Sequence, residues 1–168
     1  MALEQRSTRE LLLRGILGGI VAGIVFLLAE MVMAVALGGD ILDPLRVIGS
    51  ILLSTVAFVP DYPLAAIAVV AVIVHLVLSA VYGLIFTYVL AYADQLDASP
   101  GVLLLYGTIF GLLLWVVNLL IIAPFAFPQF GMINAFWQGF VAHTVFYGTA
   151  LGGYVAATRP GAAAALLR

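Results

Sequence analysis

The sequence contains no cysteine and no lysine, and charged residues make up only 8% of its 168 positions. Without cysteine the chain has no disulfide, no thiolate zinc site and no iron–sulfur cluster. Without lysine it has no Schiff base to retinal or pyridoxal phosphate and no phosphate-binding P-loop. The net charge is -2 and no basic run is present, so nothing in the sequence points to nucleic-acid binding.

The scarcity of charge is matched by an abundance of apolar residues, which form 65% of the chain. A soluble domain carries about 25% charged residues, because its surface must be hydrated. This composition cannot supply such a surface. The sequence therefore predicts an integral membrane protein, with residues 1–168 forming a single transmembrane domain.

Four apolar stretches are long enough to cross a bilayer, which takes about 20 helical residues. We expect an all-α bundle of four transmembrane helices. The first stretch could be mistaken for a signal peptide, but Glu30 interrupts it and it is longer than a typical signal region, so we expect it to be retained. The predicted spans are residues 15–37, 64–90, 101–123 and 133–157.

A fifth apolar stretch, residues 47–59, is too short to cross and is bracketed by Pro44 and Pro60. Ser50 and Ser54 lie opposite its apolar face. We expect a short helix in the outer membrane interface. A re-entrant hairpin that lines a cavity is the alternative.

The arginines predict the orientation of the bundle. Only Arg46 falls in a loop that four crossings place outside, and the other five lie before the first span or after the fourth. By the positive-inside rule, both termini are cytoplasmic and the protein is a multi-pass protein of the cell (inner) membrane. Aromatic residues of an outer interfacial belt agree with this orientation: Tyr62, Phe125, Phe127, Phe130, Phe136 and Trp137.

Small residues recur every four positions in each predicted span. This spacing lets helix backbones approach closely, and van der Waals contact then drives helix association in lipid. All of these pairs fall in the cytoplasmic half or near the middle, so we expect the inner half of the bundle to be tightly closed. The residues are Gly15, Gly19 and Gly23, then Ser79 and Gly83, then Gly107 and Gly111, then Gly148 and Gly152.

Polar residues occupy the outer half, at similar depth in the four helices: Glu30, His75, Asn118 and His143. Ionisable groups inside a membrane are costly and normally face the bundle interior. In the first three helices the small-residue row runs directly into the polar group at helical phase. The sequence therefore predicts an intramembrane polar cluster in the outer half of the bundle, next to an inner half that is closely packed through its glycines.

The fourth span has two close-packing faces. His143 shares one face with Gly139 and Tyr147, whereas Gly148 and Gly152 turn roughly 140–180° away at ~100° per residue. The second face could contact another subunit, or both could contact neighbours within the bundle.

The leading functional prediction is a non-enzymatic accessory or scaffold subunit of a larger membrane complex, respiratory or photosynthetic in type. We expect no cofactor, and we expect the bilayer and other membrane subunits or a second copy as partners. In this interpretation Glu30 accepts a hydrogen bond from a histidine, and the network with Asn118 and Ser79 holds the helices together. No metal or nucleophile motif predicts an enzyme.

Two alternatives use the same residues. His75 and His143, on different helices at matched depth, are the minimum for bis-imidazole ligation of haem b in an electron-transfer subunit. Glu30 with the two histidines could instead form a proton or ion relay, because histidine titrates near physiological pH and intramembrane acids mark ion paths.

Overall fold

The structure, a computed structural model, describes residues 7–132 and 136–159, and every regular element in these ranges is helical. Three long helices are apolar enough to cross a membrane. They are α2 (Thr8–Ala36), α4 (Leu64–Tyr92) and a third helix formed by α5 (Pro100–Trp115), η2 (Val116–Ile122) and α6 (Ala123–Ala126). The chain is thus an all-α protein of the multi-pass membrane type.

A further run of helix follows at the C-terminal side. It consists of α7 (Phe136–Val141), η4 (Ala142–Thr149) and α8 (Ala150–Ala157), and the residues at both junctions keep right-handed helical dihedrals. This run covers the predicted fourth span, apart from residues 133–135, which lie outside the described residues. The η2 and η4 segments are π-helical, which the sequence did not predict.

The short segment differs from its prediction. It is helix α3 (Asp43–Leu53) followed by the 3-10 turn η1 (Ser54–Phe58), so it begins before residue 47. Pro44 lies in the first turn of α3, where its missing N–H costs no hydrogen bond. The two serines differ: Ser50 is fully buried, whereas Ser54 is exposed in η1 and Leu52 is 70% exposed. A second 3-10 turn, η3 (Pro128–Met132), precedes the C-terminal helices.

Glycine contacts hold the helices together as two pairs, α2 with α4 and α5 with the run from η4 to α8. In the first pair, Gly83 of α4 lies against the backbone of Gly15 and Gly19 in α2. In the second, Gly107 of α5 lies against Gly148 and Gly152. These small residues bring the backbones so close that a β-carbon would collide with the opposing chain, which is the packing expected of helices in lipid.

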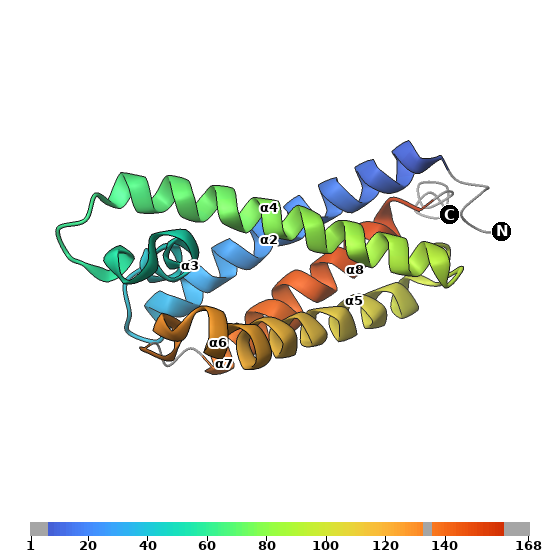
Figure 1. Cartoon of the computed structure of the whole chain (residues 1–168). Coiled ribbons are helices and arrows are strands. Elements are labelled where there is room, and N and C mark those ends of the chain that lie inside the picture. The colour runs from blue at the N-terminus through green and yellow to red at the C-terminus, as the bar shows by residue number, and fades with distance from the viewer. Residues whose placement is uncertain (1–6, 133–135, 160–168) are drawn as a thin grey trace.

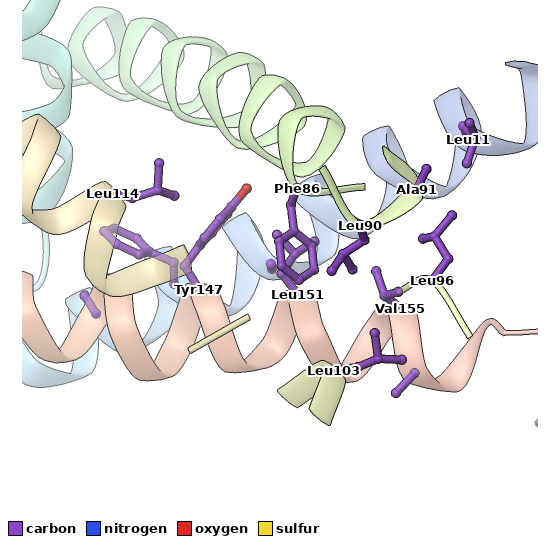
Figure 2. Close-up of a cluster of buried hydrophobic side chains, with 14 residues drawn as sticks. Leu11, Phe86, Leu90, Ala91, Leu96, Leu103, Leu114, Tyr147, Leu151 and Val155 are labelled. Carbon is purple, nitrogen blue, oxygen red and sulfur yellow. The ribbon is translucent and has the colours of Figure 1, made fainter. Parts of the chain in front are cut away.

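The hydrophobic core lies toward the end of the bundle where α2 begins and α8 ends. Figure 2 shows Phe86 and Leu90 of α4 meeting Leu151 and Val155 of α8 there. Arg14 ties the same end together, because its Nη2 donates to the carbonyl of Val155 at 2.6 Å. That carbonyl belongs to the last turn of α8 and has no partner within its own helix.

The opposite end of the bundle is less closely packed. Along their length α4 packs against α2 and α3, whereas α5 packs against η4 and α8. In Figure 1, α4 and the α5–α6 helix diverge toward the end that carries α3, α6 and α7. This divergence positions the candidate site, since side chains of both helices line the space between them.

Candidate functional site

A cavity of about 650 Å³ lies between the diverging helices. Its walls are mostly apolar and come from α2, α3 and α4, from the α5–α6 helix with η2, from η3, and from α7 and η4. Segment α3 closes one end with Val47, Ile48 and Ile51. The four residues of the predicted polar cluster all line this cavity: Glu30, His75, Asn118 and His143.

The two histidines flank a phenylalanine. The ring of Phe26 lies 5.1 Å from the imidazole of His75 and 4.9 Å from that of His143, centroid to centroid. The three rings come from α2, α4 and η4, so this aromatic group connects both helix pairs. It forms the inner part of the cavity lining, next to the glycine contacts.

Each imidazole donates to a backbone carbonyl. His75 Nε2 lies 2.8 Å from the oxygen of Gly23 in α2, and His143 Nδ1 lies 2.8 Å from the oxygen of Gly139 in its own helix. A carbonyl oxygen has no proton to give, so the ring nitrogen is the donor in both bonds. The first bond crosses between helices, whereas the second orients His143 within the fourth helical run.

Glu30 does not accept a hydrogen bond from a histidine, contrary to the expectation. Its Oε2 accepts from Nε2 of Gln138 in α7 at 3.3 Å, and the same nitrogen reaches the Glu30 carbonyl at 3.3 Å. Among the described residues no hydrogen bond joins this carboxyl group to either imidazole. The amide of Gln138 connects it instead to the C-terminal helical run.

Two tyrosines that were not part of the predicted cluster complete the polar lining. Tyr82 donates to Oδ1 of Asn118 at 3.0 Å and so bridges α4 and η2 across the cavity. Tyr147 donates to the carbonyl of Ser79 at 2.6 Å and bridges η4 and α4. Their spacing from the histidines, seven residues and four residues, is the signal that could have added them to the site.

The π-helical turns change the predicted phase of the fourth helix. The carbonyl of His143 and the Cα of Gly148 both lie against Gly111, whereas an α-helix would turn these residues apart. Tyr147 meanwhile faces α4. Both close-packing faces of the run therefore contact neighbours within this chain. Since π-helical turns are frequent at functional sites, the two that contain Asn118 and His143 strengthen the assignment of the site.

The residues present do not fit a haem held by both histidines. Such ligation needs the macrocycle between the two imidazoles, and the ring of Phe26 lies there. His75 Nε2 is also engaged with Gly23. In the described ranges, moreover, no group of three or more His, Cys, Asp or Glu side chains is arranged to hold a metal ion.

No family model, curated protein or solved structure matches this chain. The cavity and its lining are therefore the features from which a function can be inferred.

Proposed function

We propose that this chain is a small, non-enzymatic membrane protein that binds an amphipathic molecule taken from the bilayer. The cavity carries the proposal. Its volume of about 650 Å³ lies within the range of about 300–1,000 Å³ typical of small-molecule sites. Such sites combine apolar walls with a few polar groups that orient the ligand, and the lining described above has this composition.

The position of the cavity favours a ligand that arrives through the membrane. Leu78 of α4 and Leu120 and Ile122 of η2 line it and are each at least a third exposed. In a membrane these side chains contact lipid tails. An apolar chain could therefore lie between α4 and η2 while its polar head reaches the histidines.

The proposal includes the finer topology. Residues 136–157 form a fourth crossing, and both ends of the chain lie in the cytoplasm of a cell whose inner membrane contains the protein. Two observations support this. The start of α2 and the end of α8 are joined by Arg14, and of the described arginines Arg9, Arg14 and Arg159 lie near that end while Arg46 lies in α3.

A role as accessory subunit of a larger complex remains a prediction. One of the arguments for it was a second packing face of the fourth helix, and that face is occupied by α5 within the chain. A proton relay loses support in the same way, because the hydrogen bonds of Glu30 and of the two histidines do not connect. Ligand binding is therefore the function that the geometry supports best.

Tryptophan fluorescence tests the proposal. The chain has two tryptophans, buried Trp115 and exposed Trp137, and Trp115 Nε1 lies near Gly139 in the cavity lining. In a Trp137→Phe background, a fatty alcohol brominated on its chain should quench Trp115 in a saturable way in nanodiscs. Saturation distinguishes a site from the surrounding lipid.

A matched pair of double variants provides the control. Ile48→Phe with Leu78→Phe places two rings in the cavity lining, and we expect the affinity for the brominated alcohol to fall at least about fivefold. Leu52→Phe with Val77→Phe places two rings on the outer faces of the same helices, and we expect no more than about a twofold change. Unsaturable quenching, equal in both variants, would contradict ligand binding.

A further inference from the structure

The hydrogen-bonding capacity left over in the cavity is mostly that of acceptors. Because His75 Nε2 and His143 Nδ1 both donate to carbonyls, the other nitrogen of each neutral ring is an acceptor. Glu30 adds its Oε1, since the bond from Gln138 goes to Oε2. Three lining residues can therefore each accept one more hydrogen bond.

Donors are fewer on the same lining. The hydroxyl hydrogens of Tyr82 and Tyr147 already go to Asn118 and to the Ser79 carbonyl. The amide nitrogen of Asn118 remains, because the bond from Tyr82 uses its oxygen, and the hydroxyl of Ser79 is a second donor on the lining. A ligand head that satisfies this lining must donate to the imidazoles and the carboxyl group, and it can accept from Asn118. A hydroxyl group does both.

The shape of the lining favours a ring. Six aromatic side chains line the cavity besides the imidazoles, and Phe26 lies between the two histidines. Aromatic rings pack on one another in stacked or edge-to-face arrangements that a flexible polyol cannot match. These residues are Phe26, Tyr82, Phe127, Phe130, Phe136 and Tyr147.

We infer that the ligand is a quinol, a hydroxyl-bearing ring on an apolar chain, and that the histidines and Glu30 recognise its hydroxyl hydrogens. This inference rests on the proposed function, since it names the class of ligand for the same cavity. The oxidised quinone carries only carbonyl acceptors in place of the hydroxyls. The site should therefore distinguish the two redox forms by binding alone, with no electron transfer by the protein.

The test compares the two forms of one probe. Decylubiquinol and decylubiquinone have the same ring substituents and chain and differ by two electrons and the two hydroxyl hydrogens. Binding is measured anaerobically by quenching of Trp115 in the Trp137→Phe protein in nanodiscs. We expect the quinol to bind at least about tenfold more tightly, because the quinone leaves buried acceptors without partners.

Substitution of His143 separates recognition from folding. His143 Nδ1 bonds only within its own helix, so His143→Phe removes an acceptor and no hydrogen bond between helices. We expect this variant to lose about tenfold in affinity for decylubiquinol while its affinity for decylubiquinone stays within about twofold. His143→Gln keeps an acceptor oxygen and should recover part of the quinol preference.

Three results would overturn the quinol assignment. The first is that decylubiquinone binds as tightly as decylubiquinol or more tightly. The second is that dodecylamine competes for the cavity more strongly than decylubiquinol does. In the third, neither ring compound binds while the brominated alcohol still quenches Trp115 saturably, which leaves the proposed function intact. If the alcohol does not saturate either, the proposed function itself fails.

Discussion

Gly83 and Gly153 are both glycines of apolar helices, yet their surroundings differ completely. A β-carbon at Gly83 would collide with the carbonyl oxygen of Gly15 and lie 2.6 Å from the Cα of Gly19. A β-carbon at Gly153 would lie 3.5 Å from the end of the Leu104 side chain, an ordinary contact. Only the first position is one where the backbones of two helices need the missing side chain.

Gly83→Ala should therefore destabilise the α2–α4 pair. Since the neighbouring atoms belong to backbone and cannot rotate away, we expect a loss of about 1–3 kcal/mol in the free energy of unfolding. Gly153→Ala is the control and should change it by less than about 1 kcal/mol, or stabilise the helix slightly. Unfolding by a denaturing detergent in mixed micelles measures both, and equal losses would show that the α2–α4 contact is looser than described.

Among the elements, η3 is held to α3 by a buried glutamine. Nε2 of Gln129 donates to the carbonyl of Ser50 at 2.9 Å, and Gln129 is itself buried. The stacked rings of Phe127 and Phe130 lie beside it, with centroids 5.6 Å apart. The same nitrogen also lies 3.4 Å from Oγ of Ser50, so Gln129 joins two elements that both line the cavity.

Gln129→Leu should loosen that end of the molecule. Removal of a buried amide partner costs about 1–3 kcal/mol. We expect faster hydrogen exchange of α3 amides and a several-fold weaker affinity for the brominated alcohol. The matched control is Gln95→Leu in the loop between α4 and α5, which should change neither measurement. Unchanged α3 exchange in Gln129→Leu would mean that η3 does not hold α3.

On the scale of the whole molecule, two tightly packed helix pairs meet firmly at one end and diverge at the other. Glycine contacts within each pair and the hydrophobic core near Leu151 close the end where α2 begins and α8 ends. The chain passes from one pair to the other between α4 and α5, and these two helices separate around the cavity. The topology predicts which loops share a side of the membrane.

Single cysteines test that topology cleanly, because the chain has none of its own. Asp61→Cys and Gly131→Cys lie in exposed loops at the cavity end, and a membrane-impermeant maleimide should label them in intact cells. Ser99→Cys and Ala157→Cys lie at the opposite end and should react only after permeabilisation. Labelling of all four sites in intact cells would contradict crossings by α4 and by residues 136–157.

Apolar composition and helical periodicity determined by themselves that this chain is an all-α membrane protein with long spanning helices. They do so because a bilayer demands about 20 apolar residues per crossing and internal satisfaction of every backbone group. They also located the glycine rows and the residues Glu30, His75, Asn118 and His143, which are rare enough in apolar helices to be recognised one by one.

Only the tertiary structure decided which groups meet. Sequence periodicity assumes 3.6 residues per turn, so it could not reveal the π-helical turns that bring His143 and Gly148 onto the same neighbour. Nor could it find the partner of Glu30, since Gln138 lies on another helix and its approach depends on how the pairs pack. The cavity itself arises from the divergence of α4 and α5, a property of helix packing that no single segment encodes.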